Sequence, residues 1–374
     1  MKAELPIGLQ KFHRNGFINF QINRWYSLGF TRPGDLQKVA ADIKTFDDYT
    51  RGFISLAEKA EAEGRIVNAA FYYRAAEFLT SPSAPDKFRL YDKFIDLFYR
   101  AFKDAKIERN NVPYGNGFLP AMRLPSLIEP ASGTVVIHGG FDSLIEEFYC
   151  FWEYFAEAGY DVIAFDGPGQ GGALRKYGLT FEHDWEKPAK AILDYFNLSD
   201  ITLLGISMGG YWCLRAAAFE KRISRVIAFP PLYDWMESTN TLNRWLANSV
   251  AKWDWLMNET TRLKMRSPLM KHVVNQTLFI TGKKNLSDVA RWDMAMNKEH
   301  IHSELVDQHV LLLAGERDLF QPVILYHKQM KALTKAMSVT GRIFTRKDKA
   351  ENHCGIGNIR LPLEVMVEWL EQKK

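Results

Sequence analysis

Apolar residues in the first quarter of the chain recur at the spacing of one helix face. Side chains three and four positions apart predict helices at residues 35–43, 46–62, 66–79 and 87–102. Gly64 separates two of these helices, and a stretch rich in Ser and Pro at 81–85 precedes the last. Since no segment returns at a fixed period, we expect a helical bundle or arm over residues 1–110 rather than a repeat array.

The pattern changes at about residue 115, where short β-branched runs begin to alternate with helical segments. Strands are predicted at 134–137, 161–165, 201–204, 225–229, 310–314 and 342–345. Helices are predicted at 144–158, 185–196, 211–220, 321–337 and 362–372. This alternation is typical of a mostly parallel sheet with helices on both faces. We therefore expect an α/β domain over residues 111–374.

A long stretch between the strands at 225–229 and 310–314 has no strand pattern but is rich in large apolar residues. It holds half of the chain's ten tryptophans and several methionines: Trp235, Trp245, Trp253, Trp255, Trp292, Met236, Met257, Met265, Met270, Met294 and Met296. An insertion of this length is expected to carry its own secondary structure. We expect a helical cap at about 232–305 whose apolar side chains enclose a buried, mostly apolar pocket.

The composition limits which binding partners and which cellular location are expected for the protein. The 374 residues are 47% hydrophobic and 25% charged, with a formal net charge of +4. Lys and Arg do not cluster, so neither a nucleic acid nor a membrane is expected as a partner. The three cysteines are widely spaced, which excludes a disulfide framework. With no run typical of a signal peptide or a membrane span, the expected location is the cytoplasm.

The segment Gly205-Ile-Ser-Met-Gly209 lies between a predicted strand and a predicted helix. A serine at the tip of such a tight turn has a strained backbone, and side chains at Gly205 and Gly209 would collide with neighbouring backbone. The N-terminus of the following helix then points toward the serine. This arrangement predicts Ser207 as a nucleophile.

A serine nucleophile needs a base and an acid, which follow it on loops after later strands in this type of sheet. His353 lies on the loop after the last predicted strand, whereas His327 falls within a helix, so His353 is the expected base. Glu316 and Asp318 both follow the strand at 310–314. Asp318 is favoured as the acid because it comes last in its turn, and Glu316 remains the alternative.

An oxyanion hole requires two backbone N–H donors near the nucleophile. One is expected from Met208, the residue after the serine. The other is expected from Phe141, with Gly140 as the alternative, because the Gly-Gly pair after His138 allows close backbone approach. His138 itself is expected to pack under the site.

The glycine-rich segment Asp166-Gly-Pro-Gly-Gln-Gly-Gly172 lacks the Lys-Ser/Thr of a phosphate loop and the glycine register of a dinucleotide site. We expect it to form a tight loop and one wall of the site. No His, Cys and acidic residues have metal-ligand spacing, and Cys354 is expected to be a packed thiol. Neither a cofactor nor a metal is therefore expected.

Asp234 and Glu237 follow the strand at 225–229 and so lie near the same sheet edge. The favoured interpretation is that they are N-terminal acids of the first cap helix. The alternative places them in the substrate pocket with Trp235.

Four motifs together resemble the α/β-hydrolase superfamily: His138-Gly-Gly-Phe-Asp-Ser143, Phe165-Asp-Gly-Pro-Gly-Gln-Gly171, Gly205-Ile-Ser-Met-Gly-Gly210 and Asn352-His-Cys354. Within it, the chain resembles the branch of the FrsA-type esterases, dihydroxypseudooxynicotine hydrolase and the fungal polyketide-shortening hydrolases, which also carries a helical N-terminal domain. The resemblance implies a Ser207–Asp318–His353 triad without a cofactor. Some members of that branch cleave esters. Others cleave a β-diketone carbon–carbon bond with help from an acidic residue near the cap, a place that Asp234 or Glu237 could fill.

We therefore expect a serine hydrolase that acts on a small-molecule acyl compound through an acyl-enzyme. The favoured substrate is a carboxylic ester with a bulky apolar group. Carbon–carbon cleavage of a β-diketone and acyl transfer to an alcohol or amine remain open, while a peptidase and a non-catalytic binding scaffold are less favoured. The aromatic-rich N-terminal arm can pack on its own catalytic domain or on that of a partner, so a homodimer is also open.

Overall fold

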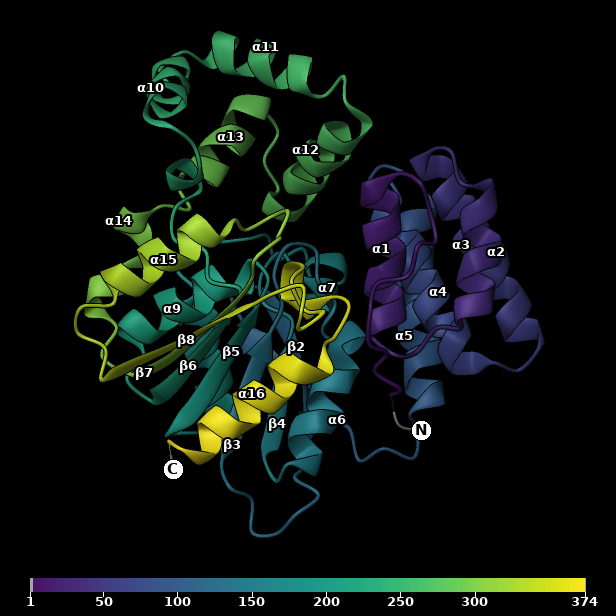
Figure 1. The fold of residues 1–374 in the computed structure, drawn as a ribbon, viewed down its shortest axis with the longest axis horizontal. Helices are drawn as coiled ribbons and strands as arrows, with labels where there is room; N and C mark the ends of the chain where they lie inside the picture. The colour runs from purple at the N-terminus through teal and green to yellow at the C-terminus, as the bar shows by residue number, and fades with distance from the viewer. Residues whose placement is uncertain (1–2, 374) are drawn as a thin grey trace.

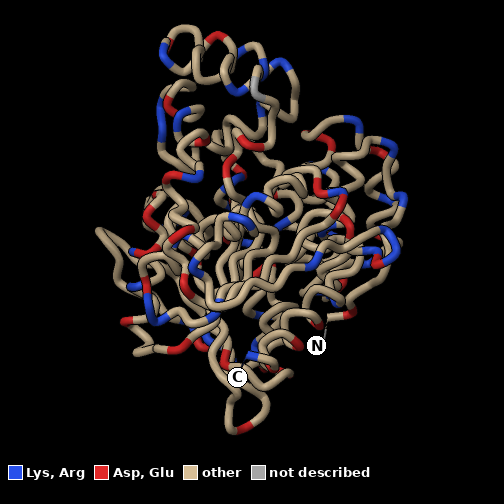
Figure 2. The backbone as a smooth tube through the Cα atoms, turned by 60° about the vertical axis from the view of Figure 1, so that its left-hand side comes forward, with Lys and Arg blue, Asp and Glu red and all other residues tan. Residues whose placement is uncertain are grey.

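The computed structural model describes residues 3–373. A central sheet is flanked by an N-terminal helical bundle and is covered at one end by a separate group of helices (Figure 1). Lys and Arg are interspersed with Asp and Glu along the outer helices and loops (Figure 2). Over the described residues, no helix is both long and apolar enough to span a membrane.

Five helices form the N-terminal bundle. They are α1 (Gly16–Ser27), α2 (Pro33–Asp42), α3 (Phe46–Ala62), α4 (Ile66–Leu79) and α5 (Asp86–Ala101). The four predicted helices are confirmed, and α3 begins at a capping box in which Thr45 and Asp48 satisfy each other's backbone N–H groups. Helix α1 was not predicted, because the buried Gln21 and Asn23 interrupt its apolar pattern.

The eight-stranded sheet has the order β1-β2-β4-β3-β5-β6-β7-β8. Its strands are β1 (Glu108–Tyr114), β2 (Gly117–Leu124), β3 (Thr134–His138), β4 (Asp161–Phe165), β5 (Ile201–Ile206), β6 (Ile223–Phe229), β7 (His309–Gly315) and β8 (Ser338–Phe344). Strands β1 and β2 form an antiparallel hairpin, and β2 also pairs antiparallel with β4. The remaining neighbours, from β4 to β8, pair parallel. The hairpin was not predicted, and the expected boundary at residue 110 falls inside β1.

Alternate residues of the parallel strands pack into two different hydrophobic clusters. In β5, Leu204 and Ile206 lie in the cluster that includes the N-terminal helices, α6 (Tyr149–Glu157) and α16 (Arg360–Glu371). Leu203 lies in the cluster on the other face, with α8 (Glu186–Tyr195), α9 (Gly209–Phe219) and α15 (Val323–Ala332). The bundle therefore packs on its own catalytic domain, which is one of the two arrangements left open above.

Two predicted helices have different limits. Residues 144–158 form the 3₁₀-helix η1 (Ile145–Phe148) followed by α6. Helix α15 ends at Ala332 instead of 337, because the backbone N–H of Met337 bonds to the carbonyls of Asp307 and Gln308 and so leads the chain into β8.

The segment between β6 and β7 is helical, as its lack of a strand pattern predicted. It contains η2 (Trp235–Ser238), α10 (Thr241–Val250), α11 (Asp254–Lys264), α12 (Pro268–Thr281), α13 (Leu286–Met294), α14 (Lys298–Ile301) and η3 (Ser303–Leu305). Helices α10 to α13 form the cap at the upper end of the sheet in Figure 1, while α14 and η3 pack against α9. Two short helices lie near the site: α7 (Gly171–Arg175) and η4 (His353–Gly355).

Candidate active site

Ser207 occupies a tight turn between β5 and α9. Its φ is +61°, a left-handed conformation that is strained for a serine. A Cβ at Gly205 would lie 2.0 Å from the carbonyl oxygen of Gly209, and a Cβ at Gly209 would lie 2.7 Å from that of Gly139. Neighbouring backbone therefore lies too close to Gly205 and Gly209 for either position to carry a side chain. This agrees with the collision predicted from the sequence.

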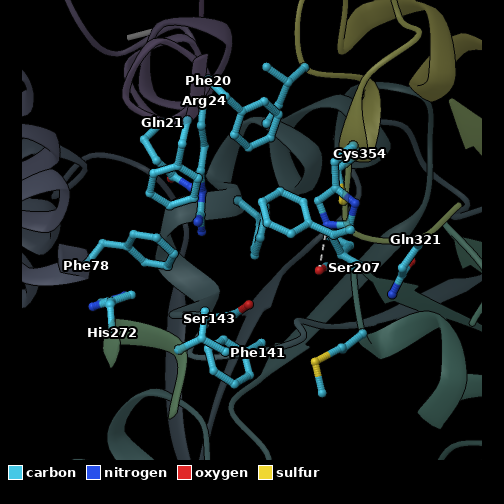
Figure 3. A pocket seen from close by; sticks show the side chains of 18 of the residues that line it. Phe20, Gln21, Arg24, Phe78, Phe141, Ser143, Ser207, His272, Gln321 and Cys354 are labelled. Atoms are coloured by element: carbon cyan, nitrogen blue, oxygen red, sulfur yellow. Dashed lines mark hydrogen bonds between the residues drawn. The ribbon is translucent and has the colours of Figure 1, made fainter. Parts of the chain in front are cut away.

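Ser207 begins a chain of hydrogen bonds that crosses two loops. Its Oγ lies 2.8 Å from Nε2 of His353 (Figure 3), and Nδ1 of His353 lies 2.7 Å from Oδ2 of Asp318. With its proton on Nδ1, the imidazole donates to Asp318 and accepts from Ser207. The structure thus brings together the three residues that the sequence singled out.

The alternative acid and base lie elsewhere. An Oε1 of Glu316 accepts the backbone N–H of Arg346 on the exposed side of its loop. His327 is exposed on α15. Neither side chain is part of the hydrogen-bonded chain at Ser207.

The protonation of His353 is set by opposing effects. Burial is the largest single effect and lowers the pKa of the imidazole, but the charges and hydrogen bonds of Asp318 and Cys354 together outweigh it and raise the pKa of His353 above the ordinary value of 6.5. Because only a neutral imidazole can accept a proton, the fraction of His353 able to do so increases with pH.

Two backbone N–H groups near Ser207 have no acceptor among the described residues, those of Phe141 and Met208. The N–H of Gly140 donates instead to Oγ of Ser143 at 2.9 Å. A Cβ at Gly140 would lie 2.6 Å from the nitrogen of Met208, so the two loops are in close contact. Phe141 and Met208 are therefore free to donate to a ligand oxygen, while the alternative donor Gly140 is already engaged.

The glycine-rich segment 166–172 supports the Gly140 loop from behind and does not line the cavity, so its expected place as a wall of the site is wrong. The amide of Gln170 donates to the carbonyls of Gly139 and Gly140 at 2.8 and 3.0 Å. His138, the last residue of β3, is buried beneath the loop, and burial lowers its pKa to about 4. His138 therefore packs under the site, as predicted from the sequence.

A cavity of about 370 Å³ opens at Ser207 and is lined mainly by apolar side chains (Figure 3). Phe17, Phe20 and Phe78 come from the N-terminal bundle, and Leu269 and Val273 come from the cap. The predicted apolar pocket is present, but its walls differ from those expected. Trp235 is the cap tryptophan that lines it, whereas three others are 59–66% exposed: Trp245, Trp253 and Trp255.

Asp234 and Glu237 do not line this cavity, so their assignment to the substrate pocket is wrong. Asp234 is the N-cap of η2 and accepts the N–H of Met236 at 2.7 Å, as the favoured interpretation predicted. Glu237 pairs with Arg244 at 2.7 Å and with Lys328. Both carboxylates therefore hold the start of the cap in place.

Comparison with known proteins identifies the family. The sequence profile described as alpha/beta hydrolase fold matches residues 134–287. Hydrolase acrC of Aspergillus aculeatus is 31% identical, with 75% of this chain and 78% of acrC aligned. The chain belongs to the α/β-hydrolase superfamily.

Two further relatives extend this assignment. FUS2 of Gibberella moniliformis, named a 20-hydroxy-prefusarin hydrolase, is 32% identical over 69% of this chain and 73% of its own. The crystal structure of 2,6-dihydroxy-pseudo-oxynicotine hydrolase shares the fold with a TM-score of 0.65 at 20% identity, covering 93% of this chain and 94% of its own. The hydrolase thus resembles the branch that its motifs indicated.

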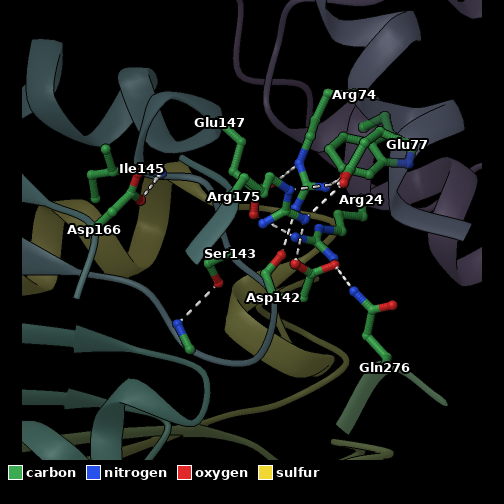
Figure 4. A network of polar contacts seen from close by, with 12 residues as sticks. Arg24, Arg74, Glu77, Asp142, Ser143, Ile145, Glu147, Asp166, Arg175 and Gln276 are labelled. Atoms are coloured by element: carbon green, nitrogen blue, oxygen red, sulfur yellow. Dashed lines mark hydrogen bonds and ion pairs between the residues drawn. The ribbon is translucent and has the colours of Figure 1, made fainter. Parts of the chain in front are cut away.

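A buried ionic network next to Phe141 was missed by the sequence analysis (Figure 4). Asp142 has a φ of +45°, and its carbonyl accepts Nη2 of Arg74 at 2.7 Å. Its carboxylate pairs with Arg175 at 2.6 Å and Lys87 at 3.4 Å, and also accepts the amide of Gln276. Burial opposes ionisation, but these cations hold the pKa of Asp142 below its usual range. The bundle, α7 and the cap therefore all fix the loop of this α/β hydrolase that carries Phe141.

The network continues into the bundle through two further carboxylates. Glu147 binds Nε of Arg74 at 2.8 Å and Nη2 of Arg24 at 2.5 Å. Glu77 binds Arg175 at 2.7 Å and Lys87 at 3.0 Å, and also contacts Arg74. One sequence signal was available, since Arg74 stands within a nearly uniform apolar run of α4.

Within residues 3–373, no group of three His, Cys, Asp or Glu side chains is placed to hold a metal ion. Cys354 lines the cavity beside His353, and its thiol donates to the carbonyl of Phe229 at 3.6 Å. The cavity at Ser207 is also lined by the polar side chains of Ser143, Asp293 and Gln321.

Proposed function

We propose that this α/β hydrolase is a serine hydrolase that cleaves a carboxylic ester with a bulky apolar group through an acyl-enzyme on Ser207. The observation that carries the proposal is the hydrogen-bonded chain from Ser207 through His353 to Asp318, which opens into an apolar cavity. The word hydrolase in the names of acrC and FUS2 supports the reaction class.

In the first half of the reaction, Nε2 of His353 takes the proton of Ser207 as Oγ attacks the ester carbonyl. The oxygen that becomes negative accepts the N–H groups of Phe141 and Met208. When the intermediate collapses, the imidazolium gives its proton to the departing alkoxide, and the acyl group stays on Oγ.

In the second half, His353 takes a proton from the water that attacks the acyl-enzyme. The acyl–Oγ bond then breaks, the imidazolium returns the proton to Oγ of Ser207, and a carboxylic acid is released. Asp318 holds the imidazole in the tautomer that both halves need and stabilises its positive form. The aromatic side chains of the cavity, among them Phe20, Phe78 and Phe148, suit a bulky apolar acyl or alcohol group.

Labelling with a fluorophosphonate, read by intact mass, tests the nucleophile. We expect one adduct on the unmodified protein, none on Ser207→Ala, and labelling slowed by about 10²-fold or more in His353→Ala. Ser143→Ala is the matched control because Ser143 also lines the cavity, and it must keep the adduct. A folded protein that does not label, or that labels equally in Ser207→Ala, contradicts the proposal.

A second candidate is hydrolysis of the carbon–carbon bond of a β-diketone, and Asp293 favours it. This cap residue lines the cavity, and its enclosure raises its pKa to about 7. Attack of Ser207 on one carbonyl would break the bond to the α-carbon and leave an enolate. A protonated Asp293 could supply the proton that this enolate needs, and water would then release the acyl group.

The variant Asp293→Asn separates the two candidates. If the enzyme cleaves carbon–carbon bonds, kcat/KM for a β-diketone falls by about 10²-fold or more, because general acid catalysis is lost. Cleavage of a p-nitrophenyl ester, whose leaving group needs no proton, stays within about threefold of the wild-type value. Equal losses on both substrates, or no turnover of β-diketones by the wild-type enzyme, contradict the second candidate.

A further inference from the structure

The part of the cavity formed by α1 is polar, although the rest of its wall is apolar. Gln21 and Arg24 lie three residues apart on α1, and both line the cavity. Figure 3 shows the two side chains near Phe78, on the side of the cavity away from Ser207. Neither residue takes part in the steps proposed above.

Arg24 has unused hydrogen-bond donors. Its Nη2 donates to Glu147, whose other oxygen already accepts from Arg74. The remaining N–H groups of Arg24 have no acceptor among the described residues. The guanidinium lies 4.4 Å from the ring centre of Phe78 and 4.8 Å from that of Trp25, so aromatic faces hold it in place beside the cavity.

The directly bonded ionic network leaves an excess of positive charge at this point. Four cations face three carboxylates: Arg24, Arg74, Lys87 and Arg175 against Glu77, Asp142 and Glu147. Arg24 is the cation with an accessible side chain, at 17%, while the other three are fully buried. A cation in a poorly solvated cavity is stabilised by an anion that can form charge-assisted hydrogen bonds with it.

Gln21 adds a second polar group without a partner. It is 2% exposed, and its Oε1 has no hydrogen-bond partner among the described residues. Rotation of the amide exchanges its oxygen and nitrogen, so this position can also present a donor. The acidic side chain that lines the cavity, Asp293, belongs to the cap and has a raised pKa, so it opposes an anion at α1 only weakly.

We propose that Gln21 and Arg24 bind a carboxylate at the far end of the acyl chain of the substrate. The apolar middle of the cavity then holds the chain, and Ser207 attacks the carbonyl at its other end. This inference rests on the proposed ester hydrolysis and gives α1 a role in substrate specificity.

The test compares two matched series of p-nitrophenyl esters over a range of chain lengths. One series has a free terminal carboxylate and the other a terminal methyl group. At the chain length that spans the cavity, we expect the wild-type enzyme to favour the carboxylate ester by about tenfold or more in kcat/KM, mainly through KM. Arg24→Gln abolishes this preference and leaves the methyl esters within about threefold, whereas Arg24→Lys keeps part of it.

Arg51→Gln is the matched control, because Arg51 is an exposed arginine of the same bundle. Gln21→Leu removes a polar group without changing the charge and is expected to weaken the preference, which keeps the test valid if Arg24→Gln does not fold. Equal rates on both series in the wild type, or equal losses on both in Arg24→Gln, overturn the inference and leave the ester hydrolase intact. If no ester is cleaved and Ser207 does not label, the proposed function itself fails.

Discussion

The carboxylate of Asp318 receives hydrogen bonds from three directions. Oδ2 accepts from His353, and Oδ1 accepts the backbone N–H groups of Phe320 and Gln321 at 2.8 and 2.9 Å. Because the side chain is fully shielded from solvent, these bonds fix its position. The ring of Phe320 also packs against that of His353, with centroids 5.1 Å apart. The orientation of the base is therefore set by its neighbours before any substrate binds.

The pH dependence of hydrolysis tests this role of Asp318. The neutral imidazole is the reactive form, so kcat/KM should rise with pH through the pKa of His353, which Asp318 and Cys354 together raise above 6.5 against the effect of burial. In Asp318→Asn the raising charge is gone, so the inflection moves to lower pH while kcat/KM falls by about 10³–10⁴-fold. A p-nitrophenyl ester assayed from acid to alkaline pH measures both effects. An inflection that stays in place in Asp318→Asn contradicts this account.

At the scale of the elements, the sequence predicted those whose apolar pattern is regular. Helices α3 and α4 and strand β4 have the predicted limits. Helix α3 buries one face at helical spacing, whereas α4 and β4 are buried along nearly their whole length, and both patterns are regular in the sequence. Helix α1 escaped prediction because two polar residues face inward: Gln21 toward the cavity and Asn23 toward the backbone of Gln10. The meaning of such residues depends on the tertiary contacts they make.

The site residues that could be predicted are those marked by a local pattern in the sequence. Ser207, His353 and Asp318 were identifiable because each follows a strand, and parallel strands deliver the loops that follow them to one edge of the sheet. Arg24 and Asp142 could not be identified, since their partners lie on helices whose packing leaves no local pattern. In the cap, tryptophan content was also misleading, because composition does not tell which way a side chain points. Trp245 and Trp255 point to solvent, while bundle phenylalanines line the cavity.

At the scale of the whole molecule, the bundle and the catalytic domain share both a hydrophobic core and a buried ionic network. Residues of α1 to α5 belong to the same apolar cluster as α6 and α16. Arg74 of α4 joins Glu147 of η1 and the carbonyl of Asp142, and all three residues are fully buried. The cavity takes walls from the bundle, the catalytic domain and the cap. The shape of the cavity therefore depends on the packing of all three parts.

This dependence predicts how the protein unfolds. Glu147→Gln removes one carboxylate and leaves Arg74 buried with one fewer partner, which should lower the free energy of unfolding by about 3–5 kcal/mol. The surface variant Asp96→Asn breaks the exposed pair with Arg100 and should change it by less than about 1 kcal/mol. Urea unfolding followed by circular dichroism and tryptophan fluorescence measures both. Because the bundle and the sheet share one core, the two signals should report one transition in each protein. Two separate transitions in the wild type, or similar losses in both variants, would show that the bundle and the catalytic domain are stabilised independently.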